Sequence, residues 1–225
     1  LLRDNNLSMN DIDSVVFYED PWLKFNRIWN SYLYNSPSGI TTFSKAVKMQ
    51  IKKAWWLHSI LRKDLGYKGK IDTVLHHESH AAAAFYPSPF KDAAFLTIDG
   101  VGEWDTVTYG VGNNKNIKIL KRIQFPHSLG LLYSAFTAFT GFKINSGEYK
   151  VMGLAPYGEP KYVDLILDNL IDLKDDGSFR LNMKYFDYVT GDKTINQNFE
   201  NLFSKKQRKS ESDLSQDDMD LARSI

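Results

Sequence analysis

The sequence predicts an α/β fold, in which short apolar strands are followed by helices. The run Ile71–Leu75 has the composition of a short strand, and an alanine-rich helical segment, Ala81–Phe85, follows it and would end before Pro87. A second strand, Ala93–Ile98, is almost entirely apolar and leads directly into Asp99. Because ligand sites in α/β proteins lie at the carboxyl ends of strands, we expect a functional site where these two strands end.

The other elements are predicted from apolar periodicity and from turn residues. In chain order they are a strand at 14–18, a helix at 42–65, strands at 106–111 and 117–125, helices at 129–139 and 160–170, and small strands and turns over 171–200. The strands at 93–98, 106–111 and 117–125 predict an antiparallel meander, with the continuous apolar strand 93–98 buried on both faces.

Three further segments are predicted from composition alone. We expect the aromatic-rich stretch Trp22–Tyr34 to cover the core, residues 141–158 to form a glycine-rich loop, and residues 204–213 to form an exposed connection. A last helix would be opened by Asp213 or Ser215.

Composition limits the classes of protein to which the chain can belong. Its 225 residues suffice for one large or two small domains. The 28 basic and 27 acidic residues nearly cancel, so no field of one sign indicates a nucleic acid or an acidic membrane as partner. No apolar run is long enough to span a bilayer and no signal-peptide pattern is present, so we expect a cytoplasmic protein. Zero cysteines exclude thiolate ligands, so nitrogen and oxygen atoms must hold any metal ion.

Three of the five histidines lie within the run His76-His77-Glu78-Ser79-His80. His76 and His80 are four residues apart, so on a helix both imidazoles project from one face and can bind the same metal ion. The His77-Glu78 pair resembles the start of a zinc-protease motif, but that motif requires a histidine where the sequence has Ala81. Alternatively, the histidines cap the strand or bond backbone carbonyls. Two imidazoles fill only half of a coordination shell, so the metal hypothesis requires a carboxylate from elsewhere.

Asp99 is the carboxylate that the sequence offers. Its position directly after a strand would complete the metal site if strands 71–75 and 93–98 are neighbours. Gly100 and Gly102 would let the backbone approach an anion closely and present amides to phosphate oxygens. The alternative is a two-residue hairpin, for which Asp-Gly is the commonest signal.

A second glycine-rich run, 146–158, contains Lys150. Such a loop can hold a phosphate through amides and an ammonium group, and the alternative is an ordinary connection with a solvated lysine. We expect His127, which follows Pro126, to cap or pack, and His58 to lie at the surface or at the edge of the core. The sequence does not assign His77 to the helix interior or to a cleft.

Four motifs in this order carry a specific resemblance: His76-His77-x-x-His80-Ala-Ala, Asp99-Gly-Val-Gly-Glu-Trp, Phe125-Pro-His-Ser-Leu-Gly and Ser146-Gly-Glu-Tyr-Lys-Val-Met-Gly-Leu-Ala-Pro-Tyr-Gly. Together they resemble the amino-terminal domain of the O-carbamoyltransferase family. That family includes nodulation protein U, the cephem carbamoyltransferases and the tobramycin carbamoyltransferase. The resemblance extends over residues 10–225.

The resemblance implies an actin/hexokinase-like (ribonuclease H-like) fold. It also implies transfer of a carbamoyl group from carbamoyl phosphate, through a carbamoyl-adenylate formed with ATP, to a hydroxyl of a small metabolite. His76 and His80 match the family's metal-binding pair and Asp99 matches the aspartate that completes this side of the site, with iron the expected ion. The turn Gly100-Val101-Gly102 and Lys150 match the nucleotide and phosphate cleft. A homodimer is one assembly that the resemblance leaves open.

By the same resemblance, residues 1–225 form a partial amino-terminal domain, truncated at both ends and inactive alone. The family's His-Asp turn, whose histidine acts on the acceptor, would precede the chain. A further aspartate ligand and a second, adenylate-forming domain would follow it. Two other functions stay open: a metal- and nucleotide-binding relative that acts on transfer RNA, and a non-catalytic nucleotide-binding module. The near-neutral charge argues against transfer RNA as a partner.

Overall fold

The computed structural model describes residues 2–191 and 193–225. The chain forms two compact units. Unit 1 contains the residues up to Thr97 together with Gly102–Trp104 and Thr108–Lys121, and unit 2 contains Ile98–Val101, Asp105–Val107 and Arg122–Ile225. Helices and strands both occur along the chain, so the predicted α/β class is confirmed.

The helices are α1 (Pro21–Tyr34), α2 (Ile40–Leu65), α3 (His76–Phe85), α4 (Leu129–Phe139), α5 (Glu148–Leu154), α6 (Val163–Asn169), α7 (Gln197–Leu202) and α8 (Gln216–Ser224). The strands are β1 (Ser14–Phe17), β2 (Lys70–Thr73), β3 (Asp92–Ile98), β4 (Asp105–Asn113), β5 (Asn116–Gln124), β6 (Ile171–Leu173) and β7 (Phe179–Leu181). Short 3₁₀ helices span Arg3–Asn5, Met9–Asp11, Ala155–Tyr157 and Met183–Tyr185.

In unit 1, β1 and β2 form a parallel pair in which Val15 lies opposite Ile71. Parallel strands require a long crossover, and the helices α1 and α2 supply it. Helix α1 begins sharply because the Asp20 carboxylate accepts the N–H groups of Trp22 (2.8 Å) and Leu23 (3.1 Å). The crossover therefore starts at a fixed point directly after β1.

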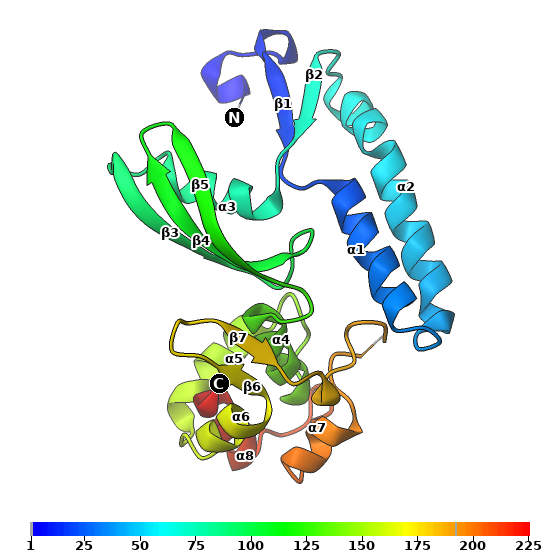
Figure 1. Ribbon diagram of the computed structural model, residues 1–225, viewed down its shortest axis with the longest axis vertical. Helices are drawn as coiled ribbons and strands as arrows, with labels where there is room; N and C mark the ends of the chain where they lie inside the picture. Colours follow the sequence, from blue (N-terminus) through cyan, green and yellow to red (C-terminus); the bar gives the residue numbers. More distant parts are fainter. Residues whose placement is uncertain (1, 192) are drawn as a thin grey trace. The chain divides into compact units, whose positions relative to one another are not determined.

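Helices α1 and α2 lie side by side as a hairpin (Figure 1). The aromatic side chains of α1 pack across this hairpin, with ring centroids 5.7 Å apart for Trp22 and Trp55 and 5.5 Å apart for Trp29 and Phe43. Trp22, Trp29 and Tyr34 nevertheless remain 47%, 43% and 83% exposed. The expectation that this stretch covers the core is therefore wrong for these three side chains.

The strands β3, β4 and β5 form a sheet in that order, which confirms the predicted meander. Asn114 donates its N–H to the Lys91 carbonyl (2.7 Å), and Asp99 donates its N–H to the Thr106 carbonyl (2.9 Å), as antiparallel strands require. The prediction that β3 is buried on both faces is wrong, because Leu96 and Ile98 are 62% and 51% exposed. Alternate residues of β3 are exposed along its whole length, as on a strand with one open face.

The core of unit 2 forms around helix α4, whose observed bounds match the predicted ones. Phe136 and Phe139 are fully buried and contact the rings of Phe199 and Phe203, with centroids 5.1 to 5.7 Å apart. Tilted and edge-on aromatic contacts of this kind stabilise a core beyond the burial of area alone. The cluster joins α4 to α7, two helices that are far apart in the sequence.

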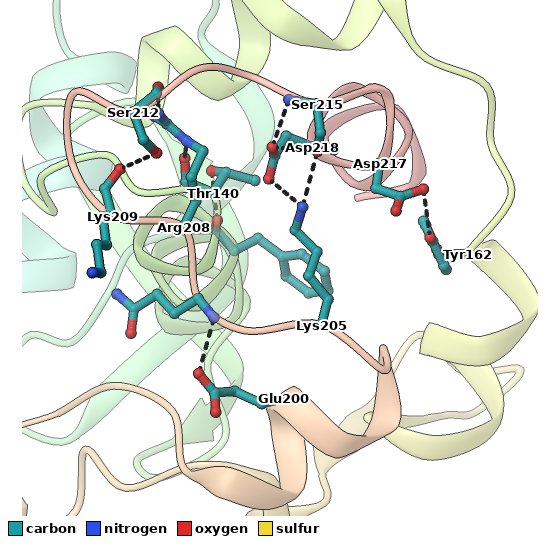
Figure 2. Close-up of polar contacts among 12 residues, drawn as sticks. Thr140, Tyr162, Glu200, Lys205, Arg208, Lys209, Ser212, Ser215, Asp217 and Asp218 are labelled. Atoms are coloured by element: carbon teal, nitrogen blue, oxygen red, sulfur yellow. Dashed lines mark hydrogen bonds and ion pairs between the residues drawn. The ribbon is translucent and has the colours of Figure 1, made fainter.

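The segment 204–213 is anchored to its surroundings, contrary to the simple exposed connection that we expected. Figure 2 shows the Lys205 ammonium close to the Ser215 hydroxyl (2.9 Å) and the Asp218 carboxylate (3.0 Å). Arg208 donates a hydrogen bond from Nε to the Thr140 carbonyl (2.6 Å). Asp218 is 1% exposed, so its charge requires a partner such as Lys205.

Helix α8 begins at a capping box formed by Ser215 and Asp218. Ser215 accepts the Asp218 N–H through its hydroxyl (3.3 Å), and Asp218 accepts the Ser215 N–H through its carboxylate (2.9 Å). Of the two predicted caps, Ser215 is thus the correct one. Helix α6 begins at Val163, three residues after the predicted start at Pro160.

Among the helices that the structure describes, none combines the length and the apolar character needed to cross a membrane.

We expect Phe136→Ala to lower the free energy of unfolding of unit 2 by about 3–5 kcal/mol, because it leaves a cavity in a fully packed aromatic cluster. Tyr149→Ala is the control, since Tyr149 is 64% exposed and its loss should cost less than about 0.5 kcal/mol. Urea unfolding followed by circular dichroism measures both values. Equal losses in the two variants would contradict the assignment of the core.

Candidate metal centre

Two imidazoles of helix α3 lie together. His76 is the first residue of the helix and His80 follows one turn later, which places their Nε2 atoms 3.1 Å apart. His80 is exposed and His76 is half-buried. Two nitrogen atoms about 2.1 Å from one ion and at this separation subtend roughly a right angle, which suits an octahedral ion better than a tetrahedral one. The helix thus brings both rings together, as the i, i+4 spacing predicted, and their binding of a metal ion stays a prediction.

His77 faces the interior, which answers the question that the sequence left open. It is 1% exposed, and its Nδ1 lies 2.6 Å from the Thr97 hydroxyl of β3. That hydroxyl in turn lies 2.7 Å from the hydroxyl of Thr108 in β4. These buried hydrogen bonds attach α3 to the sheet, so His77 serves the structure of the helix.

The segment Gly102–Trp104 packs against the start of α3. A Cβ atom at Gly102 would lie 2.9 Å from the His76 Cβ, so only glycine permits this approach. The neighbouring Glu103 is 5% exposed, and its two carboxylate oxygens lie 3.1 and 3.2 Å from the His76 backbone nitrogen. Sequence reasoning assigned Gly102 to phosphate and did not identify Glu103, although Leu75, which precedes α3, has no side chain able to cap it.

Asp99 begins a six-residue connection between β3 and β4, so the alternative of a two-residue hairpin is wrong. Its carboxylate accepts the Gly100 N–H (2.6 Å). The Ser128 hydroxyl lies 2.7 and 3.1 Å from the carbonyl oxygens of Gly100 and Asp99. At Gly130, a Cβ atom would lie 2.6 Å from the Asp99 carbonyl oxygen, so the first turn of α4 also fixes this connection.

His76, His80 and Asp99 each offer one ligand atom, and these atoms lie within 4.8 Å of one another. The contacts of the chain on either side of Asp99 explain this. Thr97 precedes it and bonds to His77, and Gly102 follows it and packs on His76. The condition that we set for this, that β2 and β3 be neighbouring strands, is not met, because β2 pairs with β1 and β3 with β4.

The donor set is chemically suited to iron. Two imidazoles and one carboxylate with further positions open are characteristic ligands of non-haem iron(II), and none of these donors is a thiolate. The residues therefore fit the group that the motif resemblance implies.

Lys150 lies on helix α5, so the prediction of a glycine-rich loop over 141–158 is wrong. The helix forms because Val151 and Leu154, three residues apart, are buried on one face, and because Glu148 accepts the N–H groups of Asn145 (2.8 Å) and Gly147 (3.1 Å) just before it. The Lys150 ammonium lies 5.7 Å from the centre of the Phe142 ring, a cation–π contact. Its contact with phosphate stays a prediction.

His127 and His58 both lie where we expected them. His58 is exposed on α2. His127 accepts the Leu181 N–H through Nδ1 (3.1 Å). Burial lowers the pKa of His127, and the charge of Arg180 lowers it further. It is therefore a structural acceptor that functions in its neutral form.

Comparison with known protein families identifies a match that covers the whole chain. A family model described as "Carbamoyltransferase N-terminus" matches residues 1–225. An uncharacterized protein of Synechocystis sp. is 50% identical over 232 residues, which cover 100% of this chain and 38% of that protein.

Two nodulation proteins are also similar. Nodulation protein NolNO of Sinorhizobium fredii is 37% identical over 178 residues, covering 78% of this chain and 25% of that protein. Nodulation protein NolO of Bradyrhizobium diazoefficiens is 36% identical over 108 residues, covering 48% of this chain and 20% of that protein. The chain thus spans less than two fifths of the length of each of these relatives.

We expect His76→Ala to weaken binding of iron(II) or cobalt(II) by more than about 100-fold, because loss of a ligand should exceed the 10–100-fold typical of losing an outer-shell partner. Isothermal titration calorimetry under anaerobic conditions measures the affinity. His58→Ala is the matched control, since it removes an exposed histidine from another helix of the same unit. Equal affinities in the two variants would exclude His76 as a ligand.

We also expect the stability of unit 2 to fall as the pH decreases below about 6.5, the unfolded-state pKa of histidine. Because the folded-state pKa of His127 is lower, the unfolded chain binds the extra proton, and folding loses free energy as the pH falls. His127→Gln keeps an acceptor without this titration. Its unfolding free energy, measured by urea denaturation between pH 7 and 5, should fall less steeply than that of the unmodified protein. Parallel curves would contradict the role of His127.

Proposed function

The chain belongs to the carbamoyltransferase N-terminal family, and we propose from this that it is part of an ATP-dependent O-carbamoyltransferase. The observation that carries the proposal is the family match over residues 1–225, together with the paired imidazoles of His76 and His80. The substrates would be carbamoyl phosphate, ATP and a small hydroxylated metabolite. The similarity to two nodulation proteins supports the same family.

The fold that we propose for the complete domain is actin/hexokinase-like. The parallel pair β1–β2 and the antiparallel meander β3–β4–β5 support it, since both kinds of pairing occur in that fold. The mixed α/β class of this fold is observed directly, since helices and strands both occur along the chain.

We propose that His76, His80 and Asp99 hold a divalent ion, with iron the preferred one. When bound, such an ion supplies positive charge that neutralises phosphate oxygens during attack on a mixed anhydride. The protein's own contribution is to hold the ligands in place beforehand. His77 bonds α3 to β3, and Ser128 holds the backbone of Asp99 and Gly100.

The reaction would proceed in two chemical stages. In the first, water would cleave carbamoyl phosphate to carbamate and phosphate, and a carbamate oxygen would then attack the α-phosphorus of ATP, which forms the carbamoyl-adenylate and releases pyrophosphate. The acceptor hydroxyl then attacks the carbamoyl carbon, AMP leaves, and the hydroxyl proton passes to a base. We propose that Gly100, Val101, Gly102 and Lys150 lie near the phosphates. Backbone amides and a lysine ammonium are suitable donors for such oxygens.

The test uses protein expressed from the complete reading frame. With carbamoyl phosphate and a panel of hydroxylated acceptors, we expect pyrophosphate release from ATP that depends on carbamoyl phosphate. His76→Ala should reduce this release to background, because the phosphate charge is no longer neutralised, whereas His58→Ala should retain it.

Two results would overturn the proposal. One is release of pyrophosphate that is independent of carbamoyl phosphate. The other is binding of transfer RNA at physiological salt without any carbamoyl transfer, which would favour the relative that acts on transfer RNA.

A further inference from the structure

The first turn of helix α3 receives its cap from a distant part of the chain. The residue before the helix, Leu75, has no side chain that can accept its free N–H groups. The carboxylate of Glu103 takes that place, with its oxygens 3.1 and 3.2 Å from the His76 nitrogen. A negative charge at this end of a helix also interacts favourably with the helix dipole.

Glu103 is itself held firmly. One of its oxygens also accepts the Asp20 N–H (2.7 Å), at the start of α1. Arg27 of α1 is 8% exposed, and burial lowers its pKa to about 10 while the charges of Glu103 and Glu19 act in the opposite direction. Glu19 is buried as well and pairs with Lys24 (2.7 Å). The carboxylate of Glu103 therefore belongs to a buried network of charges, and its orientation is fixed.

We propose that Glu103 is a positioning residue for the metal ligand His76, an inference that rests on the metal centre of the proposed function. His76 is the first residue of α3, so the direction of its side chain depends on where the helix begins. Glu103 fixes its backbone nitrogen, and the adjacent Gly102 packs against its Cβ. His80 lies one turn inside the helix and depends less on this cap.

Different residues of the run Asp99-Gly100-Val101-Gly102-Glu103 thus have two different roles at the proposed metal centre. Its first residue offers a ligand atom, and its last two orient another ligand on a different element. Partners of this kind, one step removed from the ion, commonly affect metal affinity by about 10–100-fold.

The experiment compares Glu103→Ala, Glu103→Gln, His76→Ala and Ser215→Ala in protein from the complete reading frame. Cobalt(II) is the probe, and the readouts are its affinity by calorimetry, its visible absorption spectrum, and thermal unfolding. Ser215→Ala removes the cap of α8, which lies in the other unit, and therefore controls for the general cost of losing a cap.

We expect Glu103→Ala to weaken cobalt binding by about 10–100-fold and to alter the absorption spectrum. Glu103→Gln keeps an acceptor oxygen, so its affinity and spectrum should lie between those of Glu103→Ala and the unmodified protein. Ser215→Ala should lower the unfolding temperature and leave the affinity and the spectrum unchanged. A purely structural role for Glu103 would give it the same pattern as Ser215.

The inference is overturned if Glu103→Ala binds cobalt with unchanged affinity and spectrum while His76→Ala does not bind it. If His76→Ala binds cobalt normally, the metal centre itself is wrong, and the two failures are thus distinguishable. If Glu103→Ala does not fold, Glu103→Gln provides the test. A cobalt affinity and an absorption spectrum equal to those of the unmodified protein in Glu103→Gln would also overturn the inference.

Discussion

The attachment of helix α3 to the sheet is the interaction on which the site depends. One buried chain of hydrogen bonds runs from His77 Nδ1 to the Thr97 hydroxyl (2.6 Å) and on to the Thr108 hydroxyl (2.7 Å). All three residues are buried, so water cannot replace a bond that is lost. With His77 fixed inward, the helix geometry directs His76 and His80 together to another side of α3.

The parts of the site that local spacing determines could be predicted from the sequence. The spacing of four residues from His76 to His80 places both rings on one side of a helix wherever that helix lies. The observed bounds of α4 match the predicted ones for a similar reason, because its apolar side chains and its Ser128 cap are both local features. The position of Asp99 near the histidines was predicted on the condition that β2 and β3 are neighbouring strands, and they are not. The correct cause is the tertiary contact of Thr97 and Gly102 with α3.

The errors share a physical origin in long-range packing. The continuous apolar composition of β3 indicated burial on both faces, but composition does not show how many layers cover a sheet, and Leu96 remains exposed. The glycines of 141–158 indicated a loop, whereas two buried residues, Val151 and Leu154, outweigh the helix-breaking tendency of Gly153, whose Cα faces open space. The capping role of Glu103 could not be predicted from local sequence, because the residues whose N–H groups it accepts are 27 and 83 residues away.

The buried position of His77 between His76 and His80, the two proposed metal ligands, also restricts how the length of this helix can change over evolutionary time. Each residue inserted within α3 would rotate the following part of the helix by about 100°. An insertion between His77 and His80 would leave the anchor in place and turn His80 away from His76. An insertion between His76 and His77 would separate Glu103 from the residue that it caps. Ahead of His80, changes in length are therefore tolerated best in the short stretch of Val74 and Leu75 between β2 and α3, where they alter the path of the chain without altering the register of the histidines.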